Sequence, residues 1–161
     1  MCRVILIGIL FWLGSQPANA AGAQEHNKAV AIRFFEEVLD QGHLERYADS
    51  HSKDFVAHAD GRLATLAEDI AAAREERQAL PDMRVSVDRV VAEKDLVSVV
   101  WTARGTNTQP GMGLPATGKR VMTTGMTLFR FAAGKIVEEW SVFDMLSVMT
   151  QLGLYPASAA P

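Results

Sequence analysis

Hydrophobic positions in the first half of the chain recur every three or four residues, which is the spacing of a helix with one buried side. Three helical segments are predicted from this pattern: 27–40, 44–49 and 65–80. Gly42 is placed to end the first as a left-handed cap, and Pro81 ends the third. The third also begins with the capping-box residues Thr65 and Glu68. A brief strand or turn is expected at 50–58.

Beyond Pro81 the apolar residues alternate with polar ones, which is the period of strands. Four strands in two hairpins are predicted: 83–88, 97–103, 121–131 and 136–143. A Gly- and Pro-containing loop separates the hairpins at 106–118, and a short helix at 145–152 ends at Gly153. Helices followed by strands indicate an α+β fold, with helices covering one face of an antiparallel sheet. Because 121–131 carries large residues on both faces, we expect one face to line a pocket and the other to pair with a second subunit.

The first twenty residues have the pattern of a secretory signal peptide. Arg3 precedes an apolar run from Val4 to Leu13, and Ala18-Asn19-Ala20 is a small-x-small cleavage site. We therefore predict cleavage after Ala20 and a secreted or periplasmic protein. The apolar run has about half of the roughly 20 residues that span a bilayer. The alternatives are an uncleaved membrane anchor and a buried N-terminal helix.

Composition removes several classes of function. The one cysteine, Cys2, lies in the signal segment, so the mature chain has no thiol for disulfide, nucleophilic or metal chemistry. Of 16 Lys and Arg residues only Arg3 precedes the cleavage site, which leaves 15 against 19 acidic residues and a net charge of −4. With no basic run, nucleic acid is not expected as a partner. Residues 155–161 are expected to form a flexible tail.

Several short motifs occur in the order typical of one protein family. They are the loop Leu114-Pro115-Ala116-Thr117-Gly118-Lys119, the junction 80–83, the last hairpin with 129–131 and 134–140, and Asp144 with 151–153. Together they resemble the SnoaL-like polyketide (ester) cyclases over residues 26–154. The resemblance implies a nuclear transport factor 2-like cone, in which N-terminal helices wrap a curved antiparallel sheet around a pocket. It also implies a homodimer formed through the sheet, because family members commonly pair in this way.

The family includes cyclases that close a polyketide ring by an aldol reaction without metal or organic cofactor. This chemistry requires one ionisable group in an apolar pocket and donors to the enolate oxygen. Asp144 and Glu138 are candidates because each belongs to the 136–144 segment on the side of Trp140. His58 matches a histidine that relatives carry after their first strand. The alternatives are a helix cap for Asp144, a surface or interface carboxylate for Glu138, and a structural histidine for His58.

The predicted pocket is apolar with a few polar groups. Its candidate lining residues are Trp101, Arg104, Met122, Met126, Phe129, Trp140 and Ser141. Arg104 is suited to hold a substrate carboxylate or ester. The same aromatic and methionine side chains would also fill an ordinary core. A metal site is not expected, since His51, His58, Asp54 and Asp60 have no recognisable ligand spacing.

This chain departs from the cyclase pattern at the site of proton transfer. Relatives often read Glu-His-Trp-Asp where this chain reads Glu138-Glu139-Trp140-Ser141, and the facing stretch 124–127 has no histidine. The leading hypothesis is an exported protein with a pocket for a small apolar carbonyl-bearing molecule, acting by acid–base cyclisation or isomerisation. The alternative is a non-enzymatic binding or dimerisation module. A ketosteroid-isomerase-like proton shuttle would require Tyr47 to face the pocket as oxyanion donor.

Overall fold

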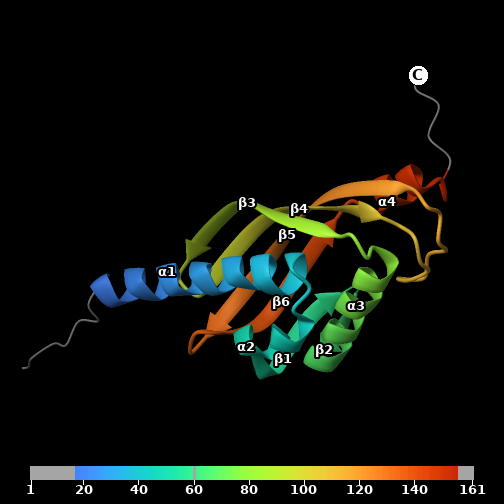
Figure 1. The fold of residues 1–161 in the computed structure, drawn as a ribbon. Coiled ribbons are helices and arrows are strands. Elements are labelled where there is room, and N and C mark those ends of the chain that lie inside the picture. The colour runs from blue at the N-terminus through green and yellow to red at the C-terminus, as the bar shows by residue number, and fades with distance from the viewer. Residues whose placement is uncertain (1–16, 60, 156–161) are drawn as a thin grey trace, which may run out of the picture.

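A computed structural model describes residues 17–59 and 61–155 (Figure 1). The helical elements are α1 (Pro17–Arg33), the π-helix η1 (Phe34–Asp40), the 3₁₀ turn η2 (Leu44–Arg46), α2 (Tyr47–Ser50), α3 (Leu66–Ala79) and α4 (Met145–Leu152). The strands are β1 (His51–Ala59), β2 (Arg62–Thr65), β3 (Arg84–Glu93), β4 (Leu96–Thr106), β5 (Arg120–Ala132) and β6 (Lys135–Phe143). The predicted α+β fold is confirmed.

All six strands belong to one curved sheet in the order β2-β1-β6-β5-β4-β3. Both predicted hairpins are present, β3 with β4 and β5 with β6. The sheet differs from the antiparallel expectation at one pair, because β1 runs parallel to β6. The strand β2 was not predicted, and β1 is nine residues long rather than a brief strand or turn. This β1–β6 pairing brings the start of the fold beside the end of the sheet.

The residues predicted to begin or end helices have the expected hydrogen bonds and backbone conformations. Thr65 Oγ1 accepts from the Glu68 backbone N–H while the Glu68 carboxylate accepts from the Thr65 backbone N–H, so the capping box is complete. Gly42 and Gly153 have φ angles of +80° and +76°, in the left-handed region where glycine is favoured. The first helix ends at Asp40 as predicted, but its start and its form differ from prediction. It begins at Pro17, and from Phe34 it widens into a π-helix.

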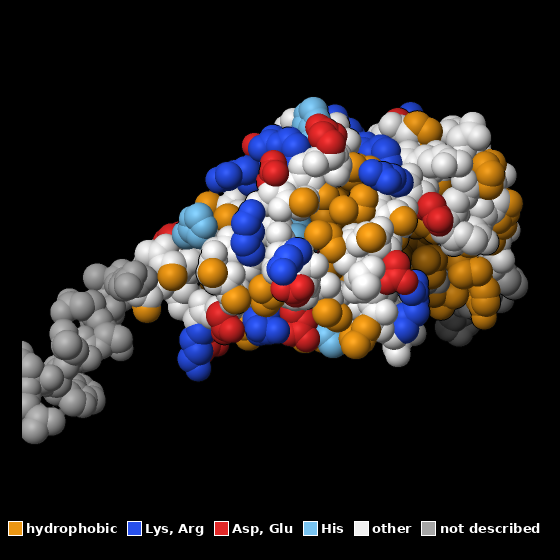
Figure 2. All heavy atoms as spheres, turned by 90° about the horizontal axis from the view of Figure 1, so that it is seen from below, with side chains coloured by type: hydrophobic (Ala, Val, Ile, Leu, Met, Phe, Trp, Pro, Cys, Tyr) orange, Lys and Arg blue, Asp and Glu red, His pale blue; other side chains and the backbone are white. Residues whose placement is uncertain are grey.

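The inner face of the sheet is the one that packs against α1, η1 and α3, which lie on one side of the strands in Figure 1. Its core joins apolar residues of the helices and strands, including Phe34, Phe35, Val97, Phe129 and Ile136. The opposite face is called the outer face below. The surface in Figure 2 mixes charged side chains of both signs with hydrophobic patches, as expected for a polar exterior with partly uncovered apolar areas.

Two sequence predictions concern the ends of the chain. Residues 1–16 and 156–161 of the predicted signal segment and tail lie outside the described residues. The predicted cleavage site after Ala20 lies within the first turns of α1. Among residues 17–59 and 61–155, no helix is long and apolar enough to cross a membrane.

Candidate functional site

The two neighbouring glutamates of β6 point to opposite faces of the sheet. Ile136 is fully buried on the inner face, and strict alternation would place Glu138 on the inner face too. A register shift between Arg130 and Phe131 on β5, opposite this part of β6, interrupts the alternation. As a result Glu138 lies on the outer face and Glu139 on the inner face.

On the outer face, Glu138 is held by two basic partners. Its Oε1 lies 2.7 Å from His58 Nε2, and its Oε2 accepts from Arg130 Nε at 2.7 Å and Nη2 at 2.6 Å. Hydrogen bonds from His58 and Arg130 lower the pKa of Glu138 below its ordinary value. The His58 ring stacks on Trp140, with centroids 4.6 Å apart. We call His58, Arg130 and Glu138 the outer ion cluster.

The outer ion cluster borders an open hollow of about 440 Å³. Ser52, Asp54 and Leu63 also line it, and Leu63 is 65% exposed. Both oxygens of Glu138 already have hydrogen-bond partners, so this carboxylate is poorly suited to take a proton from a substrate. The predicted catalytic residues His58 and Glu138 are thus brought together, but bonded to each other rather than directed at a pocket of the inner face.

On the inner face, three acidic groups lie close together in surroundings largely shielded from water. The Tyr47 hydroxyl donates a hydrogen bond to the Asp69 carboxylate, and Tyr47 is 4% exposed. Burial and the negative charge of Asp69 raise the pKa of Glu139 to about 8, and a hydrogen bond with Ser141 offsets part of the rise. Within the described residues, the buried Glu139 Oε2 has no hydrogen-bond partner. We call Tyr47, Asp69 and Glu139 the inner acid cluster.

The other two members of this cluster are perturbed in the same direction. Burial raises the pKa of Asp69, and its hydrogen bond from Tyr47 opposes the change. Burial and then the nearby charges of Glu139 and Asp69 raise the pKa of Tyr47. Glu76, two turns after Asp69 on α3, also has a pKa raised by burial. Helix α3 therefore carries a second half-buried carboxyl group.

A chain of hydroxyl groups continues from the inner acid cluster across the sheet. Trp101 Nε1 donates to Thr127 Oγ1 at 3.0 Å, and the Thr127 and Ser141 hydroxyls are hydrogen-bonded. Trp101 lies over Gly125, where an added Cβ would be 2.2 Å from the indole ring. Ser141 is exposed and Phe143 is 44% exposed. Solvent therefore reaches the β6 strand at Ser141 and Phe143, two and four residues beyond Glu139.

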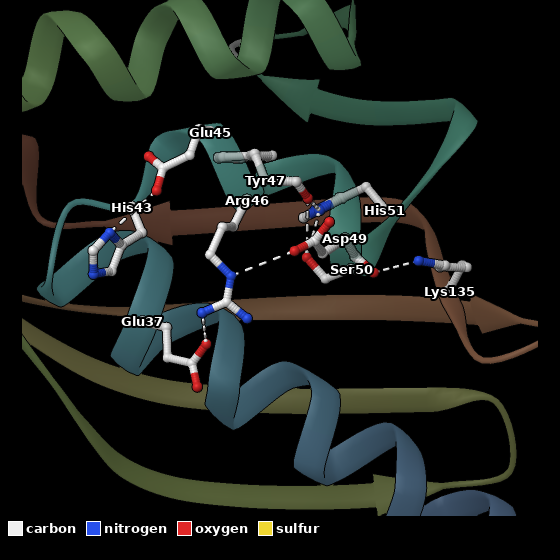
Figure 3. Close-up of polar contacts among 9 residues, drawn as sticks. All are labelled: Glu37, His43, Glu45, Arg46, Tyr47, Asp49, Ser50, His51 and Lys135. Carbon is white, nitrogen blue, oxygen red and sulfur yellow. Dashed lines mark hydrogen bonds and ion pairs between the residues drawn. The ribbon is translucent and has the colours of Figure 1, made fainter.

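His51 packs against the Tyr47 ring of the inner acid cluster. Its ring stacks on Tyr47 at 4.7 Å, and its Nδ1 lies 3.0 Å from both Ser50 Oγ and the Tyr47 carbonyl oxygen (Figure 3). The side chain packs edge-on against Phe34 and Phe55. Burial lowers its pKa to about 4, so the ring is neutral at pH 7. Nearby, the Arg46 side chain of η2 forms ion pairs with Glu37 of η1 and Asp49 of α2 (Figure 3).

The residues expected from the sequence do not share one pocket. Asp144 caps α4, with Oδ1 accepting from Ser147 N at 2.8 Å. Of the predicted lining residues, Trp101, Phe129 and Ser141 belong to the inner face, and Phe129 is fully buried in the core. The remaining four lie on the outer face: Arg104, Met122, Met126 and Trp140.

Within the described residues, no group of three or more His, Cys, Asp or Glu side chains is arranged to hold a metal ion.

The sequence interpretation missed the inner acid cluster. The sequence favours Glu138 because it alternates with Trp140 along the strand. Trp140 itself lies outside, against His58. Alternation could not reveal the interrupted register near Phe131. The isomerase-like alternative requires Tyr47 to face a pocket as an oxyanion donor, whereas the structure buries Tyr47 and engages its hydroxyl with Asp69.

Comparisons with known proteins place this geometry in context. AclR from Streptomyces galilaeus, described as a proposed hydroxylase, is 26% identical with a TM-score of 0.77, covering 84% of this chain and 86% of its own. IdmH from Streptomyces antibioticus, a proposed polyketide cyclase, is 27% identical with a TM-score of 0.70, covering 79% and 98%. A proposed SnoaL-like polyketide cyclase from a Jannaschia species is 23% identical with a TM-score of 0.76, covering 90% and 100%.

A sequence profile of one family agrees with these structural similarities. Among curated proteins, none matches this chain with significance. The profile of the family described as SnoaL-like polyketide cyclase matches residues 29–152, which is most of the chain and nearly the whole of the predicted domain. The resemblance inferred from the ordered motifs is confirmed, and the chain belongs to the SnoaL-like polyketide cyclase family.

Proposed function

We propose that this protein holds a small apolar, carbonyl-bearing molecule against the inner face of the sheet and moves a proton next to the carbonyl group. The observation that carries the proposal is Glu139, a carboxyl group whose pKa is raised to about 8 beside the hydrogen-bonded Tyr47–Asp69 pair. Family membership supports a cyclisation or isomerisation that uses neither metal nor organic cofactor. The inner acid cluster takes the place of the histidine and aspartate of the family pattern.

The proposed chemistry divides the work between two carboxyl groups. With a pKa of about 8, Glu139 is mostly protonated at pH 7, so it can donate a hydrogen bond or a proton to a carbonyl oxygen. Asp69 is the partner that accepts the proton from the carbon next to the carbonyl, since the hydrogen bond from Tyr47 favours its charged form. Pairs of acids with separated pKa values commonly divide the acid and base roles in this way. Tyr47 keeps Asp69 oriented through its hydroxyl.

We further propose that the protein acts outside the cytoplasm, as a secreted or periplasmic protein. The basic residue, apolar run and small-x-small site of the first twenty residues support export. Pairing of two chains through the outer face of the sheet at β2 and β6 is part of the same proposal. The exposed apolar side chains Leu63 and Val142 support it, at 65% and 63% exposure.

A non-enzymatic binding module is the second candidate. It is favoured by the engagement of all three carboxylate and imidazole candidates chosen from the sequence. His58 and Glu138 are paired with each other, and Asp144 is bonded to a helix N-terminus. In that case the inner face binds the molecule and the protonated Glu139 only orients it.

Thermal shift and hydrogen exchange together separate the two candidates. Aromatic polyketide esters and 3-ketosteroids are screened for compounds that raise the melting temperature. Each such compound is then incubated with the protein in D₂O, and deuterium gain next to its carbonyl is followed by mass spectrometry. The wild type should speed this exchange, and Glu139→Gln should reduce the rate about a hundredfold, because an amide cannot exchange the proton. Glu138→Gln is the matched control and should exchange at the wild-type rate.

The outcomes point to different conclusions. Stabilisation without accelerated exchange would establish the binding module and remove the catalytic proposal. Equal loss of exchange in Glu138→Gln and Glu139→Gln would show that the inner acid cluster is not the specific proton-transfer group. If no compound of either class stabilises the protein, the carbonyl-compound proposal itself is wrong.

A further inference from the structure

Three arginines gather on the outer face at one end of strands β3, β4 and β5, although the chain carries a net charge of −3. Arg84 is directly opposite Arg104 in the β3–β4 ladder. In the next ladder Arg120 is opposite Thr106, two residues beyond Arg104 on the same face. Cross-strand neighbours of this kind lie within side-chain reach of one another. We call Arg84, Arg104 and Arg120 the arginine cleft.

The three side chains line a common hollow of about 410 Å³. Arg84 and Arg104 also line a second hollow of about 140 Å³ beside it. Neither hollow includes a residue of the inner acid cluster, which lies on the other face of the sheet. The arginine cleft is therefore a separate concave site with its own charge.

The positive charge of the cleft is only partly neutralised by the protein. Arg84 Nε lies 3.4 Å from Asp40 Oδ1. The nearby Asp82 carboxylate is engaged by the backbone N–H and hydroxyl of Thr106, at 2.6 and 2.7 Å. Within the described residues, no carboxylate lies within ion-pair distance of Arg104 or Arg120. Like charges directly opposite in a sheet are unfavourable. A bound anion would relieve the repulsion between Arg84 and Arg104.

The apolar neighbour of the cleft indicates what the anion is attached to. Met122 is directly opposite Arg104 and lines the same hollow, yet 59% of it is exposed. A guanidinium group binds a carboxylate or phosphate through two parallel hydrogen bonds, which suits it to an oxyanion head group. We propose that the arginine cleft binds a small amphiphilic anion, with the carboxylate or phosphate on Arg104 and its neighbours and the apolar part over Met122.

Calorimetric titration with decanoate and decyl phosphate, each below its micelle concentration, tests this proposal. Both probes should bind the wild type, with affinity falling as salt rises. Arg104→Gln should weaken binding about tenfold or more, the expected loss of a charge-assisted hydrogen-bond pair. The matched control is Arg89→Gln, which removes the same charge from an exposed position of β3 outside the cleft and should bind as the wild type does.

Further measurements decide whether the arginines and Met122 act as proposed. Without a probe, Arg104→Gln should melt no lower than the wild type, because it removes a repulsion from the folded state. Inorganic phosphate and decanol should each bind more weakly than decyl phosphate. The proposal is overturned if neither anionic probe binds, or if Arg104→Gln and Arg89→Gln weaken binding equally. Decanol binding as tightly as decanoate would exclude the arginines as the binding groups, and inorganic phosphate binding as tightly as decyl phosphate would exclude an amphiphilic ligand.

Discussion

Glu138 and Glu139 are adjacent in β6, yet their carboxyl groups meet opposite environments. Glu138 lies between His58 and Arg130 on the outer face, and these partners favour its charged form. Glu139 lies inside near Asp69, and both burial and that charge disfavour its charged form. The comparison shows that the face and the neighbouring charges, rather than the residue type, decide which glutamate can carry a proton at neutral pH.

The largest expected effect is on the free energy of unfolding, which should depend on pH in opposite ways at the two glutamates. Glu139 has an ordinary pKa of 4.5 in the unfolded chain and about 8 in the fold, so the unfolded state loses its proton first and stability falls from pH 4.5 to 8. The loss of stability reaches about 4 kcal/mol at pH 8, at 1.36 kcal/mol per pKa unit. Glu139→Gln should recover most of it, as measured by urea unfolding at pH 5 and pH 8.

Glu138 should behave in the opposite way. Its pKa is lowered in the fold, so its contribution is present above the unfolded value of 4.5 and is lost as pH falls through the folded value. Glu138→Gln should therefore lower the free energy of unfolding at pH 7. If Glu139→Gln also destabilised the protein at pH 8, the two sites would not differ as described.

A second comparison, somewhat smaller in expected effect, uses the two histidines of β1. His51 is 4% exposed, and its pKa falls from 6.5 to about 4 on folding. The unfolded chain therefore takes up a proton between pH 6.5 and 4 that the folded chain does not, and stability falls over this range as the pH is lowered. The expected loss is about 3 kcal/mol by pH 4.

The measurement is the free energy of unfolding between pH 7 and 4 for the wild type and two variants. His51→Gln should remove most of the pH dependence of the free energy of unfolding that His51 causes. The variant is less stable at every pH, because the aromatic packing of His51 is lost. His58→Gln, on the outer face, should retain that slope. A wild-type slope that survives in His51→Gln would assign the acid sensitivity to another group.

Asp144 gives the smallest expected effect, because its carboxylate belongs to neither region. It accepts a hydrogen bond from Ser147 N at the start of α4. Asp144→Ala should cost about 0.5 to 2 kcal/mol, and Asp144→Asn should cost little, since asparagine is also a good cap. Thermal melts of both variants test the cap. If Asp144→Asn melts like the wild type but loses exchange about a hundredfold, the predicted catalytic role of Asp144 would be restored.

The sequence predicted most of the fold because its signals are local. The capping box at Thr65, the glycine at position 153 and the alternation in β3 to β6 each depend on neighbouring residues. The parallel pairing of β1 with β6 could not be read in the same way. It joins segments about 80 residues apart, and no local pattern specifies which edge strand a short segment will join.

The site was harder to predict than the fold for a physical reason. A single interrupted register exchanges the faces of all residues that follow it, so Glu138 and Glu139 exchange roles without any change in composition. The hydrogen bond between Tyr47 and Asp69 likewise depends on α2 and α3 meeting in space. The sequence named Glu138 as a candidate, and three-dimensional contacts place Glu138 on the outer face and Glu139 on the inner face.

The most direct test of the account is the protonation state of Glu139. Side-chain carboxyl carbons of glutamate are labelled with ¹³C, and the two signals are assigned by their absence in Glu138→Gln and Glu139→Gln. The account predicts that the Glu139 signal titrates near pH 8 and that the Glu138 signal titrates below 4.5. A Glu139 signal that titrates at or below 4.5 would show that the buried acid is charged at neutral pH, and the proposed proton-transfer role would be contradicted.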